Sequence, residues 1–162
     1  MSLREISLSL PNRPGTLAGV ARILAGAHIN LAAVSVDSTP TRGRVRLIVS
    51  SPERALKLLS AAGYKPEVRE LIAVKLEDRA GSFLKVLEVL ARGRVNLQSA
   101  AILITRDGNQ PLVAVSTNNL ARAHKLLQDA GFASRTAEGL ISNSDLLAGT
   151  PTIPSESVAL LL

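Results

Sequence analysis

The sequence predicts an α+β protein made of two tandem βαββαβ units, each with an antiparallel sheet and both helices on one face. Three observations lead to this fold class. The two halves of the 162-residue chain match after a shift of 66 positions, which carries Asn12 onto Asp78. Short segments alternate apolar and polar residues, as half-buried strands do. Between them, apolar residues recur every three or four positions, as in helices that cover a sheet.

A single alignment of the two copies matches their loop residues as well as their apolar positions. Asn12-Arg13-Pro14-Gly15 falls on Asp78-Arg79-Ala80-Gly81, and Ile29-Asn30-Leu31 falls on Val95-Asn96-Leu97. The apolar positions of the first helix coincide as well, namely Leu17, Val20 and Leu24 in one copy and Phe83, Val86 and Leu90 in the other. Self-similarity at loops and apolar positions together indicates two copies of one domain.

Each copy is expected to have the same six elements in the same order. In the first copy, the patterns place strands near residues 6–10, 29–36, 45–49 and 67–69, and helices near 17–24 and 52–62. In the second copy, we expect strands near 72–76, 95–104, 112–115 and 135–140, and helices near 83–90 and before Gly131. This is the order of the ferredoxin-like fold.

The repeat also predicts the domain organisation. The first domain is expected over residues 1–70, the second over 71–140 and a C-terminal tail over 141–162. Because almost no linker separates the copies, their sheets should lie close together, and a shared edge is one arrangement. The tail is either a loose end or a segment that packs on an open sheet face or a second subunit.

Local residues mark where several elements begin and end. Asn12 and Asp78 suit the cap of the first helix in each copy, where a side-chain oxygen accepts backbone N–H bonds. Pro52 suits the first position of the second helix. Residues 41–43 and 106–109 are typical of hairpin turns.

Composition excludes several classes of function. The chain has no cysteine, so disulfides and thiolate metal sites are excluded, and its two histidines form no acid–base or metal cluster. The aromatic content of 2% argues against base stacking on nucleic acid. No apolar run reaches the ~20 residues of a membrane span. We therefore expect a cytoplasmic protein that is not an enzyme, contacts no membrane and needs neither cofactor nor metal.

The charge is moderately basic. The net charge of +6 comes from 19 basic and 13 acidic residues, and fits an anionic ligand, nucleic acid or solubility alone. The arginines are spread along the chain without forming a run, so nucleic-acid binding is not favoured. Arg42, Arg44 and Arg46 are expected to line an exposed sheet face, with binding of an anion or a partner as the alternative.

The loop and strand motifs resemble those of the ACT domain family. The motif comprises residues 12–18 followed by Ala27-His28-Ile29-Asn30-Leu31, and the second copy repeats it at 78–83 and 94–97. The resemblance covers about residues 3–140 and is greatest to stand-alone tandem ACT proteins. It implies a regulatory protein without catalysis that binds an amino acid, often where two domains meet, and modulates a partner enzyme or regulator.

The candidate ligand-binding residues lie in the loops and strand starts of both copies. They are Asn12, Arg13, Pro14, Gly15, Thr16, Leu17, Asn30, Leu31, Asp78, Arg79, Gly81, Ser82, Asn96 and Leu97. The glycines let a ligand approach the backbone, and the free N–H groups at a helix start attract a carboxylate. The asparagine amides supply both a donor and an acceptor, which fits a zwitterion.

The resemblance further implies that the loop of one copy faces the second strand of the other. Loop 12–15 would then pair with Asn96, and loop 78–81 with Asn30. We expect the first loop to be the better carboxylate site, because Asp78 places a negative charge beside the second one.

A structural interpretation of the same residues remains open. Asn12 and Asp78 can serve as helix caps alone, and Gly15 and Gly81 can serve the turn alone. The alternative function is an assembly module that oligomerises through its sheets without a ligand. In either case a homodimer is expected.

Overall fold

A computed structural model of the chain describes residues 3–107 and 110–135. The elements run in the order β1 (Leu3–Pro11), α1 (Thr16–Gly26), β2 (Leu31–Ser38), β3 (Arg42–Val49), α2 (Pro52–Ala61), β4 (Glu67–Lys75), α3 (Ser82–Arg92), β5 (Leu97–Asp107), β6 (Gln110–Thr117), α4 (Leu120–Asp129) and β7 (Ser134–Arg135). The predicted α+β class and the repeated βαββαβ order are confirmed. The expected strand at 135–140 begins in β7, and its remainder and the tail lie outside the described residues.

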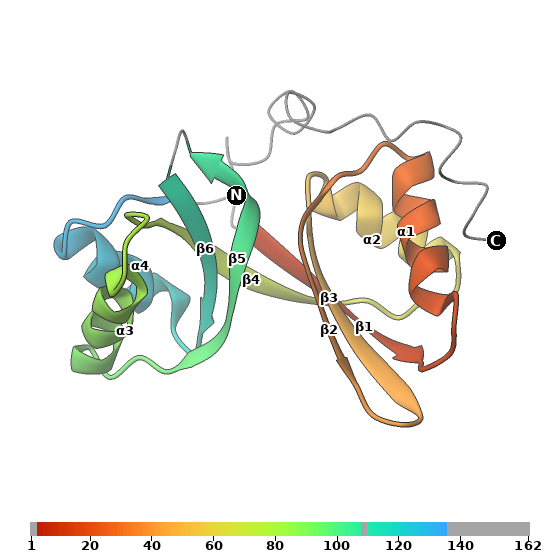
Figure 1. Ribbon diagram of the computed structural model, residues 1–162, viewed down its shortest axis with the longest axis horizontal. Coiled ribbons are helices and arrows are strands. Elements are labelled where there is room, and N and C mark those ends of the chain that lie inside the picture. The colour runs from red at the N-terminus through yellow and green to blue at the C-terminus, as the bar shows by residue number, and fades with distance from the viewer. Residues whose placement is uncertain (1–2, 108–109, 136–162) are drawn as a thin grey trace.

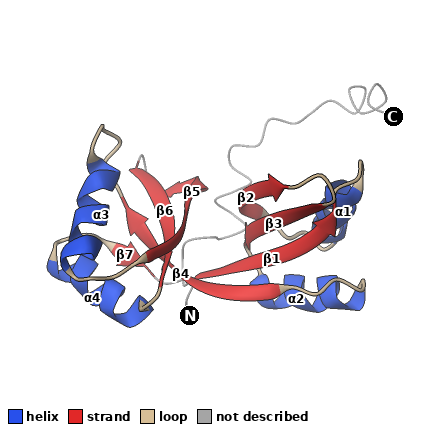
Figure 2. Cartoon of the chain, turned by 90° about the horizontal axis from the view of Figure 1, so that it is seen from below, coloured by secondary structure: helices blue, strands red, loops and turns tan. Residues whose placement is uncertain are grey.

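The two copies share one antiparallel sheet in the order β2-β3-β1-β4-β6-β5, with β7 also paired to β4. Strand β4 joins them, because residues 67–71 pair with β1 and residues 72–75 pair with β6. Figure 2 shows β4 running from beside β1 into the second half of the sheet. The expectation that the sheets lie close together is confirmed, and the junction is a shared strand.

The helices lie on the outer faces, with α1 and α2 on one half of the sheet and α3 and α4 on the other (Figure 1). In each half, the apolar face of the strands packs on its helices; Ile6 and Leu8 of β1 are 0% and 1% exposed. A third core lies between the two half-sheets and consists of Leu3, Ala32, Ala33, Ile48, Leu71, Ala73, Leu103, Leu112 and Ala114. Its many small side chains allow close approach of the two sheet faces.

The starts of α1 and α3 differ from the sequence prediction. The residue before each helix is Gly15 or Gly81, in the left-handed conformation with φ of 83° and 85°, and neither helix start has a side-chain cap bond. The prediction that Asn12 and Asp78 cap these helices is therefore wrong. Both residues lie too far before the first helical turn, since a tight glycine turn separates them from it.

Two further turns show how the chain enters its strands. The β2–β3 turn occupies residues 39–41 and closes with Thr39 N–H donating to Arg42 O at 2.7 Å, so the predicted turn at 41–43 lies two residues too late. Pro52 is the first residue of α2, as predicted. The residues that lead from α1 into β2 and from α3 into β5 include His28 and Arg94, both with positive φ, at 55° and 53°.

Candidate functional site

The loop between β4 and α3 leaves two backbone donors without a helical acceptor. Ser82 N–H donates to Arg79 O at 3.3 Å, and the regular ladder begins when Lys85 N–H donates to Gly81 O at 3.3 Å. The amides of Phe83 and Leu84 lie between these bonds at the positive end of the helix dipole. This helix start is therefore suited to an anionic group.

Ser82 adds a third donor at the same place. The residue is only 7% exposed, and its Oγ has no hydrogen-bond partner among the described residues. In the first copy the corresponding hydroxyl, on Thr16, donates to Arg13 O at 3.0 Å. The hydroxyls of Ser99, Thr117 and Ser134 are buried and unpaired within the described chain as well, and what distinguishes Ser82 is its place at a helix start with free amides.

A pocket of about 940 Å³ opens beside this helix start. Its polar end is formed by Glu77, Asp78, Arg79 and Ser82, and Arg79 forms an ion pair with Glu77. Apart from Ala80 and Gly81 of the loop, apolar residues form the rest, namely Leu76, Phe83, Leu84, Leu87, Ala100, Ala101, Ile102, Pro111 and Val113. A polar group at one end of an apolar hollow is the usual form of a small-molecule site.

The loops of the two copies lie at opposite ends of the shared sheet. Strands β1 and β4 are antiparallel and pair only through residues 3–7 and 67–71, so their carboxyl ends, and the loops that follow, diverge (Figure 1). The pocket beside Ser82 accordingly has no lining residue from the first copy's loop 12–15 or from Asn30. Within one chain, the structure brings together Asp78, Arg79, Gly81 and Ser82 at this pocket. The pairing of loop 78–81 with Asn30, which the resemblance implies, is not formed.

The three candidate asparagines make local contacts. Asn12 Nδ2 donates to Thr39 O at 2.9 Å, which ties loop 12–15 to the β2–β3 turn. Asn30 N–H donates to Ser50 Oγ, and Asn96 N–H donates to Asn118 Oδ1, each at 3.0 Å. Asn30 and Leu31 line a separate pocket of about 460 Å³ beside His28. Backbone bonds of the two asparagines thus hold the starts of β2 and β5 in place.

A family model for a pair of ACT domains matches residues 1–129. The chain belongs to the ACT domain family. The sequence resemblance is thereby confirmed, and both glycine loops lie within the matched region. No curated protein matches the chain.

Solved structures share the fold of this ACT pair. Protein BT0572 from Bacteroides thetaiotaomicron is 24% identical, with a TM-score of 0.79 over 86% of this chain and 96% of that one. The regulatory subunit of aspartate kinase from Thermus thermophilus, in its ligand-free form, is 18% identical, with a TM-score of 0.59 over 80% and 93%. The Thermus flavus subunit is 16% identical, with a TM-score of 0.54 over 81% and 94%.

Sequence reasoning missed the apolar part of the ACT pair's pocket. Leu84 and Leu87 lie on α3, and Ile102 lies on the opposite strand β5. The sequence contained a signal for this apolar part. Segment 100–104 carries apolar residues on both strand faces, and the first copy covers only one of these faces. Leu103 faces the inter-sheet core, and Ile102 is left 74% exposed on the helix side.

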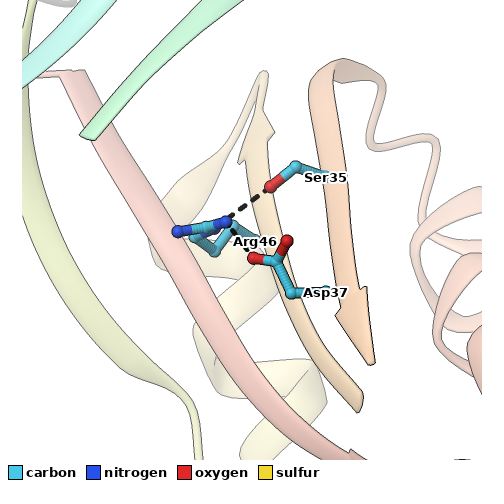
Figure 3. A network of polar contacts seen from close by, with 3 residues as sticks. All are labelled: Ser35, Asp37 and Arg46. Atoms are coloured by element: carbon cyan, nitrogen blue, oxygen red, sulfur yellow. Dashed lines mark hydrogen bonds and ion pairs between the residues drawn. The ribbon is translucent and has the colours of Figure 1, made fainter. Parts of the chain in front are cut away.

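Two of the arginines on β3 of the ACT pair, Arg42 and Arg46, have partners on the neighbouring strands. Arg46 contacts Ser35 Oγ through Nε at 3.1 Å and forms an ion pair with Asp37 (Figure 3). Arg42 Nη1 donates to Ser9 Oγ at 2.9 Å. These contacts favour the interpretation of an exposed sheet face stabilised by cross-strand pairs.

Two classes of site are not found in residues 3–107 and 110–135. No three His, Asp or Glu side chains gather there as metal ligands would. None of the helices described has the length and apolar character needed to cross a membrane.

Proposed function

We propose that this ACT pair is a regulatory protein without catalysis that binds a small carboxylate, an amino acid or a close relative, beside α3. The observation that carries the proposal is the start of α3 beside the pocket, where the amides of Phe83 and Leu84 have no helical acceptor and the buried hydroxyl of Ser82 has no partner in the described chain. The ligand carboxylate accepts hydrogen bonds from this hydroxyl and from the amides of Phe83 and Leu84. The carboxylates of Glu77 and Asp78 at the polar end suit an ammonium group.

The backbone beside Ser82 leaves room for such a ligand. Gly81 has φ of 85°, and a Cβ built there would meet no atom within 4 Å. The space in front of the helix start is therefore open, and a left-handed glycine holds the loop in the shape that exposes the amides.

Strand β4 offers a route from the ligand to the rest of the molecule. The pocket loop follows directly after β4, whose first half pairs with β1 of the first copy. A ligand that orders this loop biases the end of a strand shared by both copies, and a partner enzyme or transcriptional regulator senses the change. The two Thermus proteins of similar fold are regulatory subunits of aspartate kinase, which is a role of this kind.

The assembly of the protein is proposed to be a cytoplasmic homodimer. The end strands β2 and β5 have one free edge each within the described sheet, and β2 carries the exposed apolar residues Val34 and Val36. Unpaired edges with apolar side chains favour pairing with another chain. The same edges support the alternative of a ligand-independent assembly module, which predicts one subunit number with and without ligand.

That loop 12–15 of the first copy forms a second ligand site remains a prediction. Asn12 and Thr16 already use their side-chain donors on backbone oxygens of the same copy. Loop 78–81 is therefore favoured over loop 12–15 as the carboxylate site, which reverses the expectation from the sequence. Both loops are included in the test below.

A thermal-shift screen of the full chain against the amino acids tests the proposal. A ligand present at ~100 times its dissociation constant should add about 2.7 kcal/mol of stability. Ser82→Ala should remove most of this gain, and Thr16→Ala, the matched control in the first copy, should keep it. Absence of a shift with every amino acid at millimolar concentration would refute the sensing function.

A further inference from the structure

We infer that the pocket beside α3 selects carboxylates with an apolar side chain, and that Leu87 and Ile102 are the residues that set this selectivity. The inference rests on the proposed function, because it concerns the same pocket. It goes further by naming the chemical class of the ligand and the side chains that distinguish it from polar relatives.

The pocket is divided into two chemically different parts. The polar and charged lining residues Glu77, Asp78, Arg79 and Ser82 lie in the loop and first position where α3 begins. The side chains of Leu84, Leu87, Ile102 and Val113 beyond it have no hydrogen-bonding group. A ligand held by its carboxylate at the polar end therefore places its side chain against carbon atoms only.

The exposure of these residues indicates that something covers them. Ile102, Ile104 and Leu84 are 74%, 68% and 57% exposed, the highest values among the exposed large apolar residues of the described chain. Ile102 and Leu84 line the pocket, and Ile104 is two residues further along the same strand. Covering such side chains with an apolar group removes water from both surfaces and is favourable.

The first copy lacks this apolar part and provides a natural control. The repeat places Ala18 and Ala21 where the second copy has Leu84 and Leu87. Val36 occupies the place of Ile102, because it pairs with Val45 as Ile102 pairs with Val113. Val45 and Val113 are equivalent, since they pair with Leu8 and Val74 at matching positions of the repeat. The larger apolar residues are thus confined to the copy whose helix-start hydroxyl is unpaired.

The expected selectivity for apolar ligands follows from the free energy of moving a ligand side chain from water onto this apolar surface. Each methylene group of the ligand that leaves water for this surface should tighten binding by about fourfold. A charged side chain such as that of aspartate or lysine would lose its hydration without gaining a partner, so its affinity falls well below that of leucine. A single hydroxyl is rejected less strongly.

Calorimetric titration of the full chain with L-leucine, L-phenylalanine, L-serine, L-aspartate and L-lysine tests the inference. Leucine or phenylalanine should bind at least about tenfold more tightly than the others. Ile102→Ala and Leu87→Ala should each weaken the apolar ligands by about tenfold. Ile102→Leu should restore binding, and Val36→Ala, the first-copy control, should leave it unchanged.

Three other outcomes would each overturn the inference. Equal or tighter binding of serine, aspartate or lysine would overturn the selectivity while leaving the proposed function standing. Absence of binding by every amino acid would overturn both. If Ile102→Ala changed the subunit number in light scattering and left ligand affinity unaltered, Ile102 would be a subunit contact, and the assignment to ligand selectivity would be wrong.

Discussion

Ser82 and Thr16 occupy equivalent helix starts, yet only one of the two hydroxyls is paired. Thr16 donates to Arg13 O at 3.0 Å, whereas Ser82 Oγ is buried without a partner in the described chain. The backbone bonds around them are otherwise alike, since each N–H donates to the oxygen three residues earlier at 3.3 Å. One copy thus satisfies its helix-start hydroxyl internally, and the other leaves its hydroxyl unpaired beside the larger apolar pocket.

This difference predicts opposite effects on stability in the absence of ligand. Ser82→Ala should leave the free energy of unfolding unchanged or raise it by up to about 1 kcal/mol, because an unsatisfied buried hydroxyl is removed. Thr16→Ala should lower it by about 1 kcal/mol, because a formed hydrogen bond is lost. Urea unfolding measures both values. A clear loss of stability in Ser82→Ala would show that its hydroxyl has a structural partner.

Asn12 is predicted to be structural. Its side chain holds the loop to Thr39 O at 2.9 Å, and the contact is exposed. Asn12→Ala should therefore cost about 0.5 to 1 kcal/mol of unfolding free energy and leave amino-acid binding unchanged. The same titration applied to this variant checks the second part, and a loss of binding with little change in stability would return the ligand site to loop 12–15.

Arg94 is predicted to be strained. Its φ of 53° lies in the left-handed region, which costs a residue with a side chain roughly 1 kcal/mol. Arg94→Gly should therefore raise the free energy of unfolding by about 1 kcal/mol, whereas Arg94→Ala, which keeps the Cβ, should not. Chemical denaturation of both variants checks this, and equal stability of the two would contradict the left-handed assignment.

Two glycines are predicted to respond oppositely to an added methyl group. A Cβ on Gly93 would overlap Leu126 Cδ1, at the contact between α3 and α4. Gly93→Ala should destabilise the protein by about 1 to 2 kcal/mol, and Leu126→Ala in the same chain should reduce this additional cost.

The control is Gly19, inside α1, where a Cβ would lie 3.7 Å from Tyr64 Oη. Gly19→Ala should raise stability by about 0.5 to 1 kcal/mol, because glycine is a poor helix former. Thermal unfolding distinguishes the two cases, and a destabilised Gly19→Ala variant would show that this part of α1 is more tightly packed than described.

The sequence predicted the fold well, because each element has a local pattern and the repeat doubles that pattern. It could not predict that β4 serves both copies, since strand pairing depends on partners far away in the chain. The caps were misjudged for a similar reason. Asn12 is a residue type that caps helices, but Gly15 occupies the capping position, and the Asn12 amide is bound to a turn 27 residues later.

The candidate site was predicted in part. The loop motif identified Asp78, Arg79, Gly81 and Ser82, because glycine and polar residues before a helix have a local signal. The pairing between copies was not formed within one chain, because antiparallel β1 and β4 send the two loops to opposite ends. The apolar lining residues of the pocket were not predicted, because the exposure of Ile102 depends on which sheet face the helices leave uncovered.

Amide chemical shifts give the most direct test of ligand binding beside Ser82. In a titration of the isotopically labelled full chain with L-leucine, the amide resonances of Ser82, Phe83 and Leu84 should move with a common saturation curve. Those of Thr16, Leu17 and Ala18 in the first copy should stay in place. Movement at Thr16, Leu17 and Ala18 with none at Ser82, Phe83 and Leu84 would contradict the assignment of the ligand to the second copy.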